Sequence, residues 1–289
     1  MQKTRVVHLT IVHKRYDSRI FCKECISLSE AGYDVSLIVA DGLGNETKQG
    51  VKIIDVGRAE ANRIKRMIRT SRKAVDLALG MNADIYHFHD PDLLIEALRL
   101  RKKACVIFDS HEDFPALMKQ RDYIPDFARK VLFRLCTLIE KYSAKRLSAV
   151  VCATETIQDK FARYGNIKAV VVKNYPVFSS CESETTNSYD TMKPVCYVGG
   201  LTALRGVKEM VEACNKAGVK LLLAGEFDNQ AYFDQIKAMP EWRNVEFLGY
   251  VPTSQVREKV YNRSSVGLVL LHKAPNHTHS IPIKQLEYM

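Results

Sequence analysis

The fold is decided by a stretch in the second half of the chain, Val195-Cys196-Tyr197-Val198-Gly199-Gly200-Leu201-Thr202-Ala203-Leu204-Arg205-Gly206. It opens with a short apolar run, which is typical of a strand buried in a parallel sheet. Two glycines follow, and a helical pattern begins at Gly206. Glycines let backbone N–H groups approach a phosphate, a helix N-terminus adds positive potential, and the arginine fork suits phosphate oxygens. The stretch therefore predicts a strand, a phosphate-binding loop and a helix, although its spacing matches neither G-x-G-x-x-G nor a Walker loop.

The same alternation of apolar runs and helical patterns continues on both sides of this stretch. Most runs are continuously apolar, which predicts βαβ units in doubly wound parallel sheets. The predicted strands are 6–12, 35–39, 51–56, 85–89, 104–108, 149–153 and 169–172, then 195–198, 220–224, 245–248 and 266–270. The predicted helices include 21–31, 63–79, 127–145, 206–217, 230–239 and 254–262.

A polar, hydroxyl-rich and aperiodic segment at 179–192 separates two series of such units and is predicted to be a linker. We therefore expect an N-terminal Rossmann-like domain at 1–178 and a second one at 193–289. The last residues, Leu286-Glu287-Tyr288-Met289, have the pattern of the middle of a helix. We accordingly expect the second domain to be incomplete.

The composition restricts the class of protein. With 46% hydrophobic and 26% charged residues among 289, the chain is typical of a soluble globular protein. No apolar run approaches the roughly 18 residues of a membrane span, and no signal peptide is recognised, so we expect a cytoplasmic protein. The 43 lysines and arginines exceed the 33 acidic residues by 43 − 33 = 10, which suggests an anionic partner. The eight cysteines contain one C-x-x-C, Cys22 and Cys25, and are expected to be reduced thiols.

Polar residues follow the predicted strands of the first half, where ligands of such sheets bind. The loop after the first strand carries His13, Asp17 and Arg19, which could hold a polar ligand or form a solvated loop. His87 and His89 share one face of a strand because side chains alternate with period two.

With Asp90 these two histidines could bind a metal ion. We favour a hydrogen-bonded strand end that lines a cleft, because no further His or Cys cluster accompanies them. His111 stands among Asp109, Glu112 and Asp113, so it could bind sugar hydroxyls or help a proton move. An N-cap cluster that starts the next helix is an equal alternative.

Taken together, the motifs resemble family 4 of the retaining, nucleotide-sugar-dependent glycosyltransferases, whose GT-B fold consists of two facing Rossmann-like domains. The resemblance runs along nearly the whole chain, and its opening motifs are similar to a bacterial subgroup that builds surface polysaccharides. The segments that carry it are 6–10, 16–24, 84–90, 109–112, 173–176, 197–206, 223–225, 247–249 and 282–289.

The resemblance implies roles for individual residues. His111 is placed near the transferred sugar as the catalytic candidate, and Gly199, Gly200 and Arg205 hold the donor diphosphate. Glu287 is matched to a glutamate that contacts the donor ribose, with Lys284 as a further candidate donor contact. The resemblance implies no metal ion and no cofactor other than the donor itself. The residues predicted to contact the acceptor or line the cleft are His13, Asp17, Arg19, His89, Asp90 and Glu112.

Two positions depart from the family pattern. His279 stands where the first glutamate of an E-x7-E motif is expected, which affects the usual contact to the donor sugar. Gly200 replaces an arginine that is common in the family, so Arg205 is left to carry the positive charge at the phosphate.

Two helical segments, 58–73 and 127–146, are strongly basic and amphipathic. Either their apolar faces pack on the sheet with the cations in water, which we favour, or they contact an anionic membrane at its inner face. No nucleic-acid-binding motif is visible, so we expect no nucleic-acid partner.

The predicted function is transfer of a sugar from a nucleotide sugar to a lipid-linked or growing acceptor in O-antigen, capsule or exopolysaccharide synthesis. Two alternatives remain open: a truncated, catalytically inactive glycosyltransferase remnant and, ranked last, a GT-B nucleotide-sugar epimerase.

Overall fold

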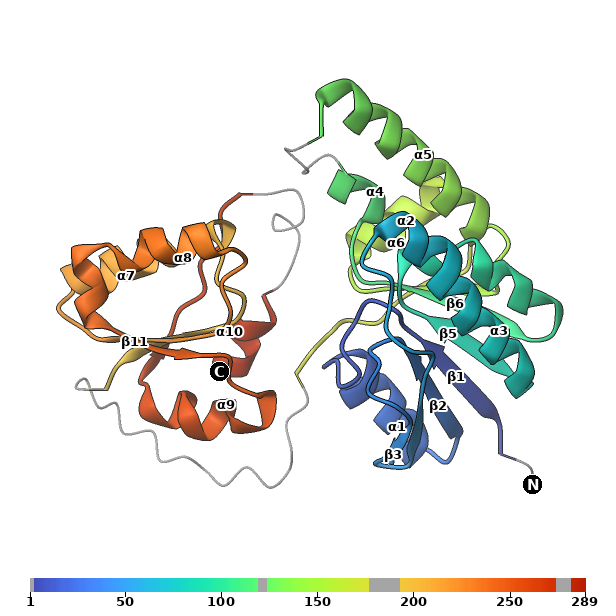
Figure 1. The fold of residues 1–289 in the computed structure, drawn as a ribbon, viewed down its shortest axis with the longest axis horizontal. Helices are drawn as coiled ribbons and strands as arrows, with labels where there is room; N and C mark the ends of the chain where they lie inside the picture. The colour runs from blue at the N-terminus through green and yellow to red at the C-terminus, as the bar shows by residue number, and fades with distance from the viewer. Residues whose placement is uncertain (1–2, 119–123, 177–192, 274–281) are drawn as a thin grey trace. The chain divides into compact units, whose positions relative to one another are not determined.

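A computed structural model describes residues 3–118, 124–176, 193–273 and 282–289. The chain divides into two compact units, Met1–Asn174 and Tyr175–Met289, each with its own sheet (Figure 1). The predicted linker at 179–192 and His279 lie outside the described residues.

The first unit is built on an eight-stranded sheet of order β3-β4-β2-β1-β5-β6-β7-β8. All neighbouring strands are parallel except β3 and β4, which are antiparallel. Every strand predicted for this half overlaps an observed one, whereas β3 was not predicted because its three residues, Glu-Thr-Lys, contain no apolar run. The strands are β1 (Arg5–Leu9), β2 (Asp34–Val39), β3 (Glu46–Lys48), β4 (Val51–Asp55), β5 (Ile85–Phe88), β6 (Cys105–Ser110), β7 (Ala149–Cys152) and β8 (Ala169–Val171).

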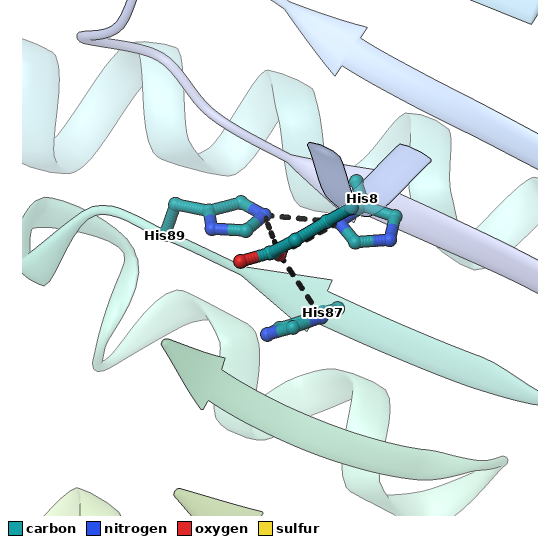
Figure 2. A group of neighbouring side chains, drawn as sticks. His8, His87 and His89 are labelled. Atoms are coloured by element: carbon teal, nitrogen blue, oxygen red, sulfur yellow. Dashed lines mark hydrogen bonds and ion pairs between the residues drawn. The ribbon is translucent and has the colours of Figure 1, made fainter. Parts of the chain in front are cut away.

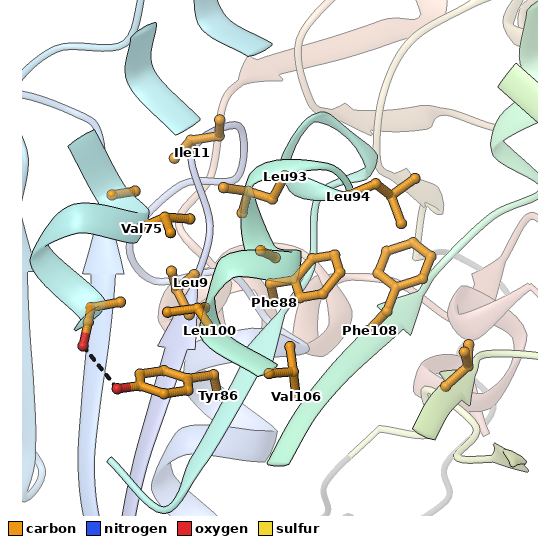
Figure 3. Packing of buried hydrophobic residues seen from close by; sticks show 14 of the residues in the cluster. Leu9, Ile11, Val75, Tyr86, Phe88, Leu93, Leu94, Leu100, Val106 and Phe108 are labelled. Atoms are coloured by element: carbon orange, nitrogen blue, oxygen red, sulfur yellow. Dashed lines mark hydrogen bonds between the residues drawn. The ribbon is translucent and has the colours of Figure 1, made fainter. Parts of the chain in front are cut away.

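Helices and helical turns cover both faces of this sheet, which explains why its strands are apolar on both sides. One face packs Phe88 and Phe108, whose rings stack with centroids 5.0 Å apart, together with Leu9 and Tyr86 (Figure 3). The buried Tyr86 hydroxyl donates to the carbonyl of Ala78 at 2.9 Å, so its polar atom is satisfied. The helical segments are η1 (Ile20–Cys25), α1 (Ile26–Glu30), α2 (Arg63–Lys65), η2 (Arg66–Thr70), α3 (Ser71–Met81), η3 (Pro91–Leu93), η4 (Glu96–Lys102), α4 (Phe114–Leu117), α5 (Asp126–Ala144) and α6 (Glu155–Arg163).

The second unit carries a four-stranded parallel sheet of order β11-β10-β9-β12, again with an apolar cluster on each face. Together the two units confirm the predicted α/β class and the two Rossmann-like sheets. The strands are β9 (Val195–Val198), β10 (Leu221–Ala224), β11 (Val245–Gly249) and β12 (Val266–Gly267). The helical segments are η6 (Ala203–Arg205), α7 (Val207–Lys216), α8 (Gln230–Lys237), η7 (Pro240–Asn244), α9 (Thr253–Lys259), η8 (Tyr261–Arg263) and α10 (Ile283–Tyr288).

The short helix α10 is held by its own side chains. The backbone N–H of Val198 donates to the Tyr288 hydroxyl oxygen at 3.1 Å. The Tyr288 ring also lies so close to Gly267 that a Cβ at this glycine would be 2.3 Å from it. These contacts fix α10 against β9 and β12.

Helix α5 corrects the expectation that its apolar stripe packs on the sheet. Phe127 is 74% exposed, and the side chains that follow it at helical spacing are exposed as well. The helix instead packs inward through Leu132, Cys136 and Ile139. Because α5 has apolar residues on two sides, periodicity alone could not tell which side faces the core. The outward stripe consists of Phe127, Val131, Leu135, Leu138 and Tyr142.

Among the described residues, no helix has the length and apolar character that crossing a bilayer requires.

Candidate functional site

Parallel pairing brings polar side chains together at the carboxyl ends of β1, β5 and β6. His8 on β1 pairs in register with His87 on β5, and His89 follows β5 directly. The three imidazoles point toward one another (Figure 2), and Nδ1 of His8 lies 3.0 Å from Nε2 of His89. Burial, followed by the neighbouring His89, lowers the pKa of His87 to about 3, so its imidazole is neutral at pH 7.

Asp90 organises the loop after β1. Its Oδ2 accepts hydrogen bonds from the backbone N–H of Ile11 at 2.5 Å and from the Thr10 hydroxyl at 3.0 Å. Its Oδ1 lies 3.4 Å from Nε2 of His13, whose Nδ1 lies 3.7 Å from Asp17. Burial alone would lower the pKa of His13, but the neighbouring Asp17 carboxylate and the charge of Asp90 raise it above its ordinary value. His13 is therefore held between two carboxylates that favour its charged form.

Arg19 and Asp109 form a buried bidentate ion pair. The guanidinium Nε and Nη2 donate to the two carboxylate oxygens at 2.8 and 2.9 Å, and Nη1 donates to the carbonyl of Val172 at 2.9 Å. Burial alone would raise the pKa of Asp109, but hydrogen bonds from His111, His89 and Arg19 hold it well below its usual range. The pair thus keeps Asp109 ionised, while the Arg19 guanidinium neutralises the charge of this carboxylate.

His111 is oriented by this charge. Its Nε2 lies 3.0 Å from Asp109 Oδ2 and 3.4 Å from His89 Nδ1, and the side chain is 20% exposed. A histidine that a buried carboxylate holds in one orientation can hydrogen-bond a sugar hydroxyl or relay a proton.

The structure brings most of the predicted first-unit residues into one network, in which some side chains are buried and others are partly exposed. Arg19, His89 and Asp90 are buried, so they position other side chains, whereas His13, Asp17 and His111 are partly exposed. The Glu112 side chain is exposed, and its charge contributes to the raised pKa of His13. The members of the network are His13, Asp17, Arg19, His89, Asp90, Asp109 and His111.

Sequence reasoning did not select His8, Glu24 or Asp109 as site residues. The signal for His8 was present, since a histidine interrupts the apolar run Val6-Val7-His8-Leu9. Glu24 lies in the helical segment η1, where a glutamate is ordinary, and gives no such signal. Burial, followed by the charge of Asp109, raises the pKa of Glu24 to about 9.

The second unit contains a pocket of about 440 Å³ at the carboxyl ends of β9 and β10, lined in part by Gly199, Gly200 and Gly225. Gly225 has a φ of +147°, and a Cβ there would lie 1.8 Å from the Gly199 carbonyl oxygen. The two loops can approach each other this closely only because Gly225 has no side chain. Arg205 reaches the same loop, since its Nη1 would be 3.3 Å from a Cβ at Gly199.

Glu287 and Lys284 form an ion pair within α10, with Lys284 Nζ 2.6 Å from Glu287 Oε2. The Tyr261 hydroxyl donates to the same oxygen at 3.0 Å, and burial with the Glu287 charge raises the pKa of that tyrosine. Neither residue of the pair is among those that line the pocket, and both remain partly exposed.

The chain is similar to known proteins both in sequence and in fold. The sequence model of the family described as Glycosyltransferase Family 4 matches residues 23–174. No curated protein sequence is significantly similar to the chain. Many solved structures share its fold at low identity, and three of them are described below.

Sucrose-phosphate synthase from Thermosynechococcus elongatus superimposes with a TM-score of 0.67 at 13% identity, over 92% of this chain and 75% of that one. WaaG, a glycosyltransferase involved in lipopolysaccharide biosynthesis, superimposes with a TM-score of 0.67 at 10% identity, over 93% of this chain and 75% of that one. Anabaena HepE in complex with UDP-glucose superimposes with a TM-score of 0.63 at 12% identity, over 94% of this chain and 75% of that one.

Proposed function

The chain belongs to glycosyltransferase family 4, and from this premise we propose that it transfers a sugar from a nucleotide-sugar donor to a lipid-linked or growing surface-polysaccharide acceptor, with retention at the anomeric carbon. The observation that carries the proposal is the pocket of the second unit, where Gly199, Gly200 and Gly225 meet beside Arg205. The solved complexes of HepE with UDP-glucose and UDP, on the same fold, support a nucleotide sugar as donor. The role of WaaG in lipopolysaccharide biosynthesis supports a surface glycan as acceptor.

The pocket is lined by Glu226 and Asp228 as well as by glycines, so the positive charge that a diphosphate leaving group needs has to come from Arg205 beside it. A planar guanidinium stabilises the charge that develops as the sugar–phosphate bond breaks. The backbone N–H groups of Gly199 and Gly225 already donate to the carbonyl oxygens of Ala224 and Gly249, so these two glycines provide space and not hydrogen bonds. We propose that Arg205 supplies this charge, with Lys284 and Glu287 contacting the rest of the donor and no metal ion taking part at the diphosphate.

We expect calorimetric titration to show saturable binding of a nucleoside diphosphate or its sugar, with a panel of UDP- and GDP-linked compounds as probes. Arg205→Ala should weaken that binding roughly 10- to 100-fold, because one charged hydrogen-bonding group is lost. Lys208→Ala is the matched control, since it removes an exposed cation that lies next to Glu212 on the following helix. A chain that binds no compound of the panel, or equal losses in the two variants, would contradict the proposed donor site.

We propose that His111 contacts the transferred sugar. Its Nε2 is engaged with Asp109, so Nδ1 is the ring nitrogen left to face a ligand. With any sugar nucleotide that the wild type turns over, His111→Gln should lower kcat by about 100-fold or more while nucleotide affinity is retained. Release of nucleoside diphosphate measures kcat, and the anomeric proton signal of the product in NMR tests retention. If kcat stays unchanged, His111 has no catalytic role.

We further propose that α5 contacts an anionic membrane, which would bring the protein to a lipid-linked acceptor. Its exposed apolar stripe is accompanied by the exposed cations Lys130, Arg134, Lys145 and Arg146, the arrangement of an interfacial helix. In the other basic segment, 58–73, Arg63 and Arg66 are already paired with Asp92 at 3.1 and 2.9 Å. That segment also has exposed cations, so α5 is distinguished by its longer exposed apolar stripe and not by its charge; these cations are Arg58, Lys65, Arg69, Arg72 and Lys73.

The wild type should float with vesicles of phosphatidylglycerol and phosphatidylcholine at low salt, and less at high salt because screening weakens the attraction. The double variant Phe127→Ser/Leu138→Ser should lose at least about 10-fold in partitioning, since each side chain contributes burial of apolar surface. Ile95→Ser is the control, because Ile95 is exposed elsewhere on the first unit. Flotation that is absent, or unaffected by the double variant, counts against membrane contact.

A further inference from the structure

Four side chains under the strand ends of the first unit converge on one point. They come from separate segments: His8 from β1, Glu24 from η1, His87 from β5 and His89 from the residue after β5. One ligand atom from each lies within 4.8 Å of all the others. Glu24 Oε2 is 4.0 Å from Nδ1 of His8 and 3.9 Å from both Nδ1 of His87 and Nε2 of His89.

These contacts are not an ordinary hydrogen-bond network. Separations of 3.9 to 4.0 Å exceed hydrogen-bond length, so Glu24 Oε2 accepts from none of the three rings. The Glu24 carboxylate oxygens have little solvent contact and no hydrogen-bond partner among the described residues. Arg19 Nε approaches Oε1 at 3.1 Å but donates its proton to Asp109. Buried polar atoms are normally hydrogen-bonded, and the Glu24 carboxyl group is an exception among the described residues.

We propose that His8, Glu24, His87 and His89 bind a divalent transition-metal ion, with Zn²⁺ the best match. In a tetrahedral zinc site the N and O ligands lie at about 2.0–2.2 Å from the ion, which places them roughly 3.3 Å from one another. Four of the six separations lie between 3.0 and 4.0 Å and bracket that value, and all six are within 4.8 Å, so the ligands must draw closer around the ion. Imidazole and carboxylate together form a ligand set that zinc commonly takes.

The surroundings also suit a metal site. Ligating histidines usually present their second ring nitrogen to a carboxylate, and Nδ1 of His89 lies 3.4 Å from Asp109 Oδ2. Arg19 beside Oε1 leaves Oε2 of Glu24 to bind the ion through one oxygen. The His87 and Glu24 side chains retain 12% and 15% exposure, so the cluster lies near the surface of the unit. The ion would join β1, β5 and η1 and would steady His89, which contacts His111.

This inference does not rest on the proposed transferase activity. A neighbouring group, His89, Asp109 and His111, is the competing place for an ion, and the variants must separate the two. The probe is Zn²⁺ alone, added to full-length protein that carries no polyhistidine tag. Metal content is measured by mass spectrometry, and affinity by competition with a chromophoric chelator.

We expect one Zn²⁺ per chain. His87→Gln and Glu24→Gln should each weaken affinity by more than the roughly 10- to 100-fold that loss of an outer partner costs. His272→Gln, which removes an exposed histidine of the second unit, should leave affinity unchanged. X-ray absorption on the wild type should show imidazole and oxygen ligands at about 2.0–2.2 Å, and this readout stands even if a variant misfolds.

Three results would overturn the proposal. The first is wild-type protein that takes up no zinc. The second is affinity that survives both His87→Gln and Glu24→Gln. The third is affinity lost in His111→Gln but kept in His87→Gln, which would move the ion to the neighbouring group.

Discussion

Arg19→Ala is expected to lower the free energy of unfolding of the first unit by about 3–5 kcal/mol. The substitution leaves Asp109, which is fully buried, without the guanidinium that neutralises it through two hydrogen bonds. Removing one partner of a buried pair costs far more than the pair contributes, because a desolvated charge remains. Urea unfolding followed by far-UV circular dichroism measures the change, since the single tryptophan, Trp242, lies in the second unit.

Lys52→Ala is the matched control. It breaks an ion pair of similar length, 2.9 Å to Asp34, in the same sheet but at the surface, where such a pair contributes about 1 kcal/mol or less. Adding Asp109→Asn to Arg19→Ala should recover part of the loss, because no unpaired charge is then buried. If Arg19→Ala costs no more than Lys52→Ala, the interpretation of Asp109 as a buried, ionised group is wrong.

Gly225→Ala is expected to weaken nucleotide affinity by about 10- to 100-fold, because the loop that carries Gly199 must move. The new Cβ would lie 1.8 Å from the Gly199 carbonyl oxygen, which is backbone and cannot rotate away. Displacing that loop changes the pocket beside Arg205, whose hydrogen bonds to a charged phosphate would each contribute about 1.5–3 kcal/mol. Titration calorimetry with the tightest-binding compound of the nucleotide panel measures the loss.

Gly218→Ala separates the steric effect from backbone strain. Gly218 also has a positive φ, +69°, but a Cβ there meets no atom within 4 Å. Both variants should lose some stability, since alanine disfavours positive φ. Only Gly225→Ala should lose nucleotide affinity. Equal affinities in the two variants would show that the close approach of the two loops does not shape the binding site.

The sequence predicted the two sheets well and the site only in part. Each predicted strand overlaps an observed one because apolar runs report burial on both faces of a parallel sheet. The edge strand β3 and the outward stripe of α5 were missed for related reasons. A polar edge strand carries no apolar run, and a helix with apolar residues on two sides does not reveal which side packs.

The site shows the same division. His87 and His89 were placed on one face of a strand by period-two alternation, and Asp90 and His111 by their position after strands. The pairing of Arg19 with Asp109, 90 residues apart, has no counterpart in local sequence. Nor does the position of Glu24 opposite His8, His87 and His89.

The sequence alone therefore determined the alternation of strands and helices, the glycine loop before Gly206 and the family, because these depend on neighbouring residues and on motif order. The tertiary structure decided which polar groups are buried together and which side of α5 faces water. The physical reason is that parallel strands align at their carboxyl ends only when the sheet forms, so that residues distant in sequence share one desolvated space. The charge state of Asp109 and the ligand geometry around Glu24 arise in that space.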